Sequence, residues 1–214
     1  MIKKDKKEIF TVGHSNHDLS YFMDLIKKYN IDTLIDVRSI PASKYNPQYN
    51  KDGLSYSLKK DNIKYLHFDK QFGARHNDEI FLDNDGIVNF ESFRKSHQFQ
   101  EGVERVDIGI EKGYKIALMC SEGDALDCHR FSMISVHLEK IGITVKHIMK
   151  DGSLRTHQDL EKDLLVKFDK KLPKPDLFNQ DIDEKTQLET AYELHNKKVG
   201  WKSENREIEE INHD

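Results

Sequence analysis

The chain lacks most of the features that place a protein in a broad functional class at once. Its 214 residues include only two cysteines and four prolines, and 34 Lys+Arg against 38 Asp+Glu give a formal net charge of −4. With no excess of positive charge, the chain as a whole does not attract nucleic acid, although a local basic patch would still bind it. The length is ordinary for one domain with additions and is sufficient to bury a core.

Long apolar segments are also absent. No run approaches the roughly 18 apolar residues of a membrane-spanning helix. The start MIKKDKKEIF lacks the apolar stretch and the cleavage site of a signal peptide. We therefore expect a cytoplasmic protein without a membrane partner. Because cytosolic thiols are normally kept reduced, we interpret both cysteines as free thiols.

Two nucleotide-binding motifs are missing as well. The sequence contains neither the glycine-rich phosphate loop of nucleoside triphosphatases nor the Gly-x-Gly-x-x-Gly fingerprint of dinucleotide-binding folds. These absences argue against hydrolysis of nucleoside triphosphates by the phosphate-loop route and against NAD-dependent hydride transfer. No internal repeat is visible.

What the chain does contain is a regular alternation of short apolar runs and segments of helical periodicity. The runs at residues 9–13, 32–39, 63–68, 114–120 and 143–149 predict strands, and helix patterns lie between them. The alternation predicts an α/β fold, with a mainly parallel open sheet and helices on both faces. Residues 1–169 form the predicted domain, and residues 170–214 a polar C-terminal tail, partly helical or disordered.

Chemically capable side chains follow the predicted strands at their carboxyl ends, the edge at which open α/β sheets bind ligands. The candidates are His14, Ser15 and Asn16 after the first strand, Asp36 and Arg38 after the second, Arg75 in the loop after the third, and Cys120, Glu122, Cys128, His129 and Arg130 after the fourth. The opposite strand ends carry mainly lysine and aspartate. This asymmetry predicts a polar site at one edge of the sheet.

Several of these residues also have purely structural interpretations. Ser15 and Asn16 are typical helix caps. Asp36 is costly to bury unpaired, so we expect an ion pair with Arg38 or Arg130. The strand histidine His67 is expected to bond to backbone. The tyrosines of YNPQYN, residues 45–50, fit an exposed turn better than a platform for stacking bases.

The segment CSEGDALDCHR, residues 120–130, is the densest in chemistry, and we favour a polar anion-binding pocket for it. In this interpretation Glu122 is an acid or base, and His129 and Arg130 hold an anionic substrate at a helix start. Cys120 and Cys128 are then small buried residues of the pocket wall.

Two other interpretations of this segment stay open. In a thiol enzyme of sulfurtransferase or phosphatase type, Cys120 or Cys128 is the nucleophile, although the phosphatase spacing Cys-x5-Arg is not met. A zinc site would use Cys120, Cys128 and His129, with His14 or His67 as a further ligand, although Cys-x7-Cys-His is not a standard ligand spacing.

The functional expectation follows from the favoured pocket. The site is predicted to bind a phosphate-bearing ligand, such as a nucleotide or a nucleic-acid end, through Arg38, Arg130 and Arg75. His14 and Glu122 would be the acid–base pair of a hydrolytic or glycosyl-transfer step, and no cofactor is predicted. The remaining alternative is a nucleic-acid-binding or regulatory module without catalysis. The sequence indicates no protein partner.

A family resemblance covers about residues 9–150. The segments TVGHSN, LIDVRSIPASKYNPQYN, IKYLHF with FGAR, and LMCSEGDALDCHR, in this order, resemble the bacterial family called domain of unknown function 488 (DUF488). The resemblance implies an α/β domain of the bacterial cytoplasm and no particular reaction. It marks as motif positions His14, Asp36, Arg38, Glu122, Cys128, His129 and Arg130. The chain departs from the family pattern after the third strand, where Phe72-Gly73-Ala74 replaces paired glycines.

Overall fold

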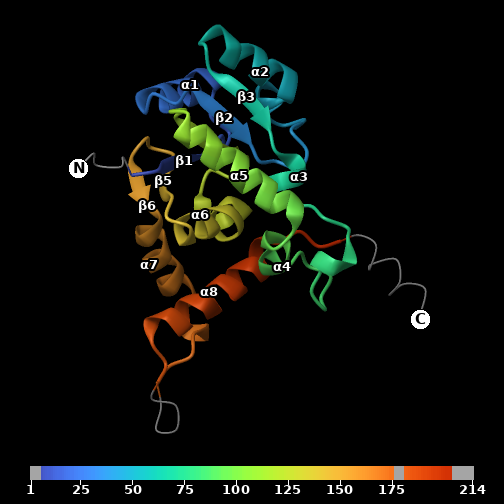
Figure 1. Ribbon diagram of the computed structural model, residues 1–214, viewed down its shortest axis with the longest axis vertical. Helices are drawn as coiled ribbons and strands as arrows, with labels where there is room; N and C mark the ends of the chain where they lie inside the picture. The colour runs from blue at the N-terminus through green and yellow to red at the C-terminus, as the bar shows by residue number, and fades with distance from the viewer. Residues whose placement is uncertain (1–5, 176–180, 204–214) are drawn as a thin grey trace.

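A six-stranded sheet forms the centre of the protein in a computed structural model that describes residues 6–175 and 181–203 (Figure 1). The strand order is β3-β2-β4-β1-β5-β6; the first five in this order are parallel, and β6 is antiparallel to β5. The bounds are β1 Glu8–Gly13, β2 Thr33–Asp36, β3 Lys64–His67, β4 Ile116–Cys120, β5 Thr144–Ile148 and β6 Leu154–Thr156. The predicted mainly parallel α/β sheet is confirmed.

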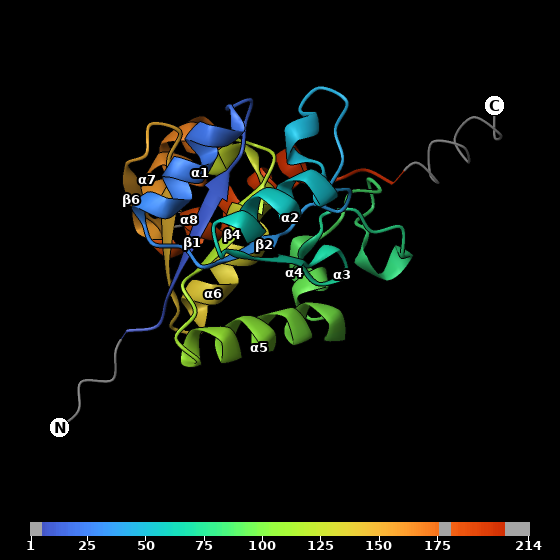
Figure 2. The same cartoon turned by 90° about the horizontal axis from the view of Figure 1, so that it is seen from above.

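Helices cover both faces of the sheet. Figure 2 shows α1 and α2 on one face and α5 and α6 on the other. The α-helices are α1 Leu19–Lys28, α2 Lys51–Lys60, α3 Asp69–Phe72, α4 Phe90–Arg94, α5 His97–Glu111, α6 Val136–Lys140, α7 His157–Phe168 and α8 Glu184–Val199. Short 3-10 turns are η1 Pro47–Tyr49, η2 Glu79–Phe81, η3 Ala125–Asp127 and η5 Asp169–Lys171, and η4 Arg130–Ser135 is a π-helix.

One apolar core on each face of the sheet holds these layers together, and a third, smaller core includes residues of α7 and α8. Every residue of β4 is buried, because the strand is paired on both sides and covered on both faces, which is why its sequence is an unbroken apolar run. Phe22 and Ile26 of α1 fill one core, and Phe99 and Val106 of α5 fill the other. Each such side chain contributes about 1.5–3 kcal/mol on full burial.

The strand register brings three carboxyl ends to one level. Gly13 at the end of β1 pairs with Cys120 at the end of β4, and Asp36 at the end of β2 pairs with Met119. From β1 the chain passes to α1 on one face, whereas from β4 it passes to η4 and α6 on the other. Open α/β sheets usually bind their ligands at the carboxyl ends of two neighbouring strands whose connections pass to opposite faces.

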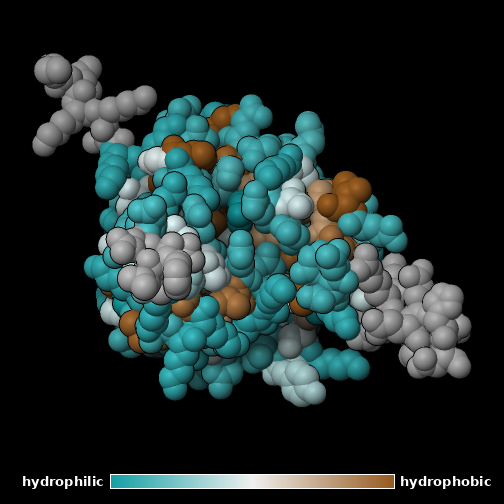
Figure 3. Space-filling model, turned by 90° about the horizontal axis from the view of Figure 1, so that it is seen from below, coloured by the Kyte–Doolittle hydropathy of each residue, from teal (hydrophilic) through white to brown (hydrophobic). Residues whose placement is uncertain are grey.

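The region after residue 170 is helical over α8, which packs against the domain (Figure 1). The expected tail conformation at residues 176–180 and 204–214 falls outside the described residues. Figure 3 views this end of the molecule from below; the visible face is mostly hydrophilic, with apolar side chains in small groups. Within residues 6–175 and 181–203, no helix combines the length and apolar character needed to cross a membrane.

Candidate functional site

The loops after β1 and β4 touch at the carboxyl edge of the sheet. The His14 N–H donates to the Cys120 carbonyl and the Ser15 N–H to the Ser121 carbonyl, both at 2.9 Å. A Cβ at Gly13 would lie only 1.9 Å from the Glu122 carbonyl oxygen. Gly13 therefore allows two backbones to approach more closely than any other residue would permit.

A buried ion pair lies beside this contact. Arg38 Nε and Nη2 donate to the two carboxylate oxygens of Asp36 at 2.9 and 2.6 Å, and the side chains are 5% and 0% exposed. Tyr65 donates its hydroxyl to the same carboxylate at 2.7 Å; burial and then the charge of Asp36 raise the pKa of this hydroxyl. Arg38 is thus the expected partner of Asp36, and its guanidinium also donates to the Tyr49 carbonyl at 2.8 Å.

His14 joins the ion pair to the first loop. Its Nδ1 lies 2.7 Å from the Ser15 carbonyl oxygen, which can only accept, so Nδ1 carries the proton and Nε2 accepts from Arg38 Nη1 at 3.3 Å. The ring stacks on Tyr49 at 4.0 Å. Burial lowers the pKa of His14 to about 4, and the charge of Arg38 adds to this effect. At neutral pH His14 is therefore a neutral histidine with both nitrogens engaged.

The structural interpretations of the sequence have mixed outcomes. Neither Ser15 nor Asn16 caps α1, which is preceded by Asp18 without a side-chain cap. His67 bonds to backbone as expected, at 2.9 Å from the Arg38 carbonyl. Tyr45 is 95% exposed, as expected for a turn.

The expectation of an exposed turn is wrong for the second tyrosine of YNPQYN. Tyr49 is fully buried because the 3-10 turn that begins at Pro47 directs its ring inward, onto His14.

The segment after β4 brings two thiols and an imidazole together. Cys120 Sγ and Cys128 Sγ lie 3.9 and 3.7 Å from His129 Nδ1, and the three atoms all lie within 4.8 Å of one another. All three residues are buried. His129 Nε2 is 3.1 Å from the Phe72 carbonyl oxygen, so this nitrogen is the donor and Nδ1 is free to face the sulfurs.

Glu122 connects this cluster to the surface. Cys120 Sγ donates to Glu122 Oε2 at 2.9 Å, although Glu122 itself is an exposed residue. Burial of the carboxyl and the negative charge of Cys128 raise the pKa of Glu122. A carboxylate therefore stands at the opening of an otherwise buried cluster.

The two thiols differ in their electrostatic surroundings. Burial alone would raise the pKa of Cys128, but the neighbouring Cys120 thiol and the charges of Arg130 and His129 hold it well below its ordinary value. The pKa of Cys120 is raised by the neighbouring Cys128 thiolate and by burial. Burial lowers the pKa of His129, but the negative charge of the Cys128 thiolate raises it above its ordinary value. The cluster therefore favours a negative charge on Cys128.

The three arginines predicted to bind an anion have different surroundings. Arg130 is 1% exposed, and its Nη1 and Nη2 donate to the carbonyls of Glu122 and Gly123 at 2.6 and 3.2 Å. Its guanidinium therefore bonds to the backbone of its own loop. Arg38 is held by Asp36. Arg75 is exposed, and no bond of its guanidinium is found within the part of the chain that the structure describes. Of the three, Arg75 is the one placed to meet a ligand from solution.

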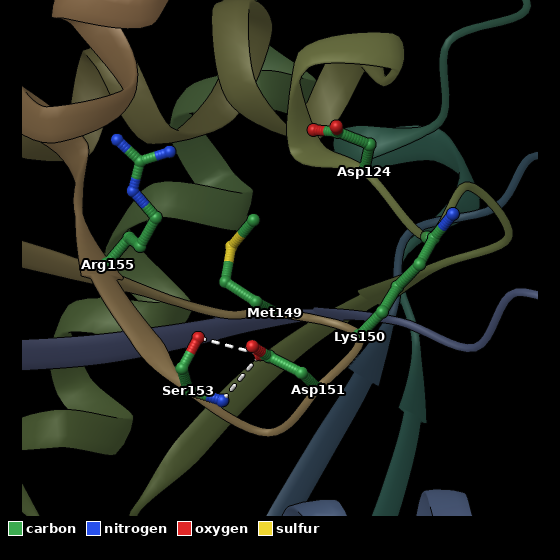
Figure 4. A pocket seen from close by; sticks show the side chains of 7 residues that line it. Asp124, Met149, Lys150, Asp151, Ser153 and Arg155 are labelled. Atoms are coloured by element: carbon green, nitrogen blue, oxygen red, sulfur yellow. Dashed lines mark hydrogen bonds between the residues drawn. The ribbon is translucent and has the colours of Figure 1, made fainter.

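A hollow of about 320 Å³ borders the same loop on the side of β5 (Figure 4). It is lined by Gly123, Asp124, Met149, Lys150, Asp151, Ser153 and Arg155. Lys150 reaches back to the loop, since a Cβ at Gly123 would lie 2.1 Å from its Cε. Asp151 is occupied by bonds from Ser153, drawn as dashes in Figure 4.

Sequence reasoning missed three contributors to the site. Tyr65 looks like an ordinary strand tyrosine, and its contact with Asp36 depends on the register of β3 against β2. Phe72 contributes only a carbonyl, which leaves no signal in a sequence. His195 of α8 bonds to the loop at Leu126, and its helical spacing with Ala191 and Tyr192 was the available signal.

A comparison with protein families agrees with the motifs. The family described as domain of unknown function DUF488 matches residues 18–136, which is more than half of the chain. The chain belongs to the DUF488 family. The DUF488 match includes the ion pair on β2 and the whole segment from Cys120 to Arg130, whereas β1, His14 and helices α7 and α8 lie outside it. No curated protein and no solved structure matches the chain.

Proposed function

We propose that this DUF488 protein is a zinc-dependent hydrolase, with Cys120, Cys128 and His129 as the metal ligands. The observation that carries the proposal is the position of two Sγ atoms and one Nδ1 atom within 4.8 Å of one another at the end of the central strand. Thiolate and imidazole are the ligand types that zinc prefers. This assignment changes the cysteines from pocket wall to ligands.

The two sulfur–nitrogen distances are close to those expected around a zinc ion. Zinc bonds of about 2.3 Å to sulfur and about 2.0–2.1 Å to nitrogen place a sulfur ligand and a nitrogen ligand of the same ion roughly 3.5 Å apart. The observed separations of 3.9 and 3.7 Å need contractions of only a few tenths of an ångström. The bond from His129 Nε2 to the Phe72 carbonyl is the outer contact that typically orients a ligating histidine.

Three protein ligands would leave the fourth position to water, as in catalytic zinc sites. A zinc ion held by these three residues would supply Lewis-acid chemistry, which lowers the pKa of bound water to about 7. Glu122 would be the proton acceptor, because its carboxylate Oε2 lies 2.9 Å from Cys120 Sγ and the residue is exposed at the edge of the cluster. Because both nitrogens of His14 are engaged, we assign it the role of holding Arg38 and not the acid–base role expected from the sequence.

We keep a phosphate-bearing compound, such as a nucleotide, as the proposed substrate. Arg75 and Lys150 support this choice, because both are exposed cations on loops at the carboxyl edge of the sheet. Arg38 and Arg130 would act indirectly, by fixing the shape of the site through Asp36 and through the loop carbonyls.

Elemental analysis of gently purified protein, with native mass spectrometry, tests the metal. We expect one zinc per chain, lost in Cys128→Ser and His129→Ala. Glu122→Gln should keep the zinc and lose turnover on a panel of nucleoside phosphates and simple phosphate esters. Glu91→Gln, an exposed glutamate of α4, is the matched control and should keep both. Protein that contains no zinc and takes up none under reducing conditions contradicts the proposal.

One specific observation favours a second function, a thiol-dependent enzyme. Cys128 precedes the π-helix η4, accepts from the Arg130 N–H at 3.4 Å and has a lowered pKa, as reactive cysteines do at helix starts. In that case the protein is free of metal, and one thiol reacts rapidly and stoichiometrically with an alkylating reagent near neutral pH.

A further inference from the structure

Helix α8 contacts the proposed metal-binding segment, although it lies far beyond the part of the chain that matches the family. His195 is fully buried and uses both ring nitrogens: Nδ1 lies 2.7 Å from Ser132 Oγ, and Nε2 lies 3.0 Å from the Leu126 carbonyl oxygen. The carbonyl can only accept, so Nε2 donates to it and Nδ1 accepts from the Ser132 hydroxyl. One imidazole thus bridges the backbone before Cys128 and the helix after His129.

Aromatic side chains surround Phe131, the residue after Arg130. Phe131 is fully buried, and its ring lies 4.6 Å from His157, 5.6 Å from Tyr192 and 5.6 Å from His195. Tyr192 of α8 is itself held, since its hydroxyl donates to Glu161 at 2.8 Å and lies 2.9 Å from His157 Nε2. The residue that follows the His129–Arg130 pair therefore has little freedom to move.

Cations hold the outer side of the same segment. Lys167 of α7 donates to the Leu126 carbonyl at 2.9 Å, so this one carbonyl receives donors from both α7 and α8. Lys167 and Lys198 also lie 3.2 and 3.3 Å from Asp127 Oδ1. The Leu126 carbonyl and the Asp127 carboxylate, directly before Cys128, are thus held by side chains of two C-terminal helices.

We infer that His195 is a positioning residue for the site, and that α8 completes the site rather than extending a finished domain. Among the described residues, the hydrogen bonds of the His195 ring go to Leu126 and Ser132 and not to a thiol or to the His129 ring, so it acts through these two residues. The assignment of the positioned atoms as zinc ligands rests on the proposed function, whereas the positioning of Cys128 and His129 by His195 is independent of it.

Competition with a chromophoric chelator measures zinc affinity in His195→Ala and His195→Gln. Loss of a partner bonded directly to a ligand typically costs about 10–100-fold in metal affinity, and for the less direct contact of His195 we expect about the lower end, a tenfold loss in His195→Ala. His195→Gln, which can still donate to the Leu126 carbonyl, should recover most of it. His97→Ala, an exposed histidine of α5, should bind zinc as the unmodified protein does.

Asn196→Ala is the matched control for a general loss of stability. Asn196 is the next residue of α8, but it bonds to the Val88 carbonyl at 2.8 Å and to the Phe90 N–H at 2.8 Å, away from the metal-binding segment. We expect lower stability in denaturation with unchanged zinc affinity. Equal zinc affinity in His195→Ala and the unmodified protein, or an equal loss in Asn196→Ala, overturns the inference.

A second readout separates this inference from the proposed function. If the protein takes up no zinc, the proposed function fails, and the rate at which a chromogenic disulfide reagent modifies Cys128 is measured in metal-free protein. Looser positioning should raise this rate at least tenfold in His195→Ala and leave it near the unmodified value in Asn196→Ala. Equal rates in the two variants would overturn the positioning role whatever the metal result.

Discussion

Substitution of Gly13 by alanine tests the contact on which the site is built. The new Cβ would lie 1.9 Å from the Glu122 carbonyl oxygen, 2.7 Å from its carbon and 2.8 Å from the Gly123 Cα, all of them backbone atoms. Relief to an ordinary contact of 3.4 Å requires the loop to move by about 1.5 Å. A shift of this size breaks the bonds that join His14 to Cys120 and Ser15 to Ser121.

The expected cost follows from these losses. Each broken backbone hydrogen bond is worth about 1 kcal/mol. Overpacking against a rigid neighbour adds about 1–3 kcal/mol. We therefore expect Gly13→Ala to lower the free energy of unfolding by about 3–5 kcal/mol in urea titrations and to release zinc.

Gly53→Ala is the control for this prediction, because a Cβ there meets nothing within 4 Å and the position lies in α2. It should stabilise the protein by about 0.5–1 kcal/mol, since alanine is the better helix former. An unchanged unfolding midpoint in Gly13→Ala would refute the argument that the close approach of the two loops matters.

Two further predictions concern buried charge. Asp36→Asn should cost about 3–5 kcal/mol in urea titrations, because it leaves the buried guanidinium of Arg38 without its counter-charge; a cost below about 1 kcal/mol contradicts this. Burial lowers the pKa of His14 and His195 to about 4 and of His157 to about 3, so the unfolded chain binds more protons below pH 6.5. Stability should be full above pH 6.5 and fall as the pH drops toward 4, less steeply in His157→Gln; a flat profile between pH 7 and 5 is the contrary result.

The strands and most of the helices were predictable because burial leaves a pattern in the sequence. The unbroken apolar run of β4 follows from its central position. Gly113 and Gly142, which follow α5 and α6, have positive φ of 83° and 87°, as glycines after helices commonly do. The edge strand β6 was missed because three residues at the margin of a sheet carry almost no pattern. The π-helix η4 was expected to be a continuous α-helix, since one wide turn shifts the apolar spacing by a single residue.

The position of the site was also predictable, because topology decides which loops meet. Parallel strands place their carboxyl ends at one edge, so the motifs after β1, β2 and β4 had to be neighbours. Which group binds which is decided by local geometry and could not be predicted. Arg130 follows a cysteine and a histidine at a helix start, as an anion-binding arginine would, yet it turns back onto the carbonyls of Glu122 and Gly123.

Composition alone predicts a polar, partly helical or disordered segment after residue 170, and it does not indicate that the helix at residues 184–199 packs on the domain. Most positions of α8 are charged or polar, but Leu188, Ala191, Tyr192, His195 and Val199 share one face, and that face packs on the domain. The irregular segment before Cys128 needs such a partner, because loop carbonyls buried without donors are costly. Arg130, Lys167 and His195 supply donors to the carbonyls of Glu122, Gly123 and Leu126. The loop that presents two thiols and an imidazole is therefore held by cationic and imidazole side chains. Two of these side chains, Lys167 and His195, come from helices outside the family match. We expect the matched region alone to lack an ordered site.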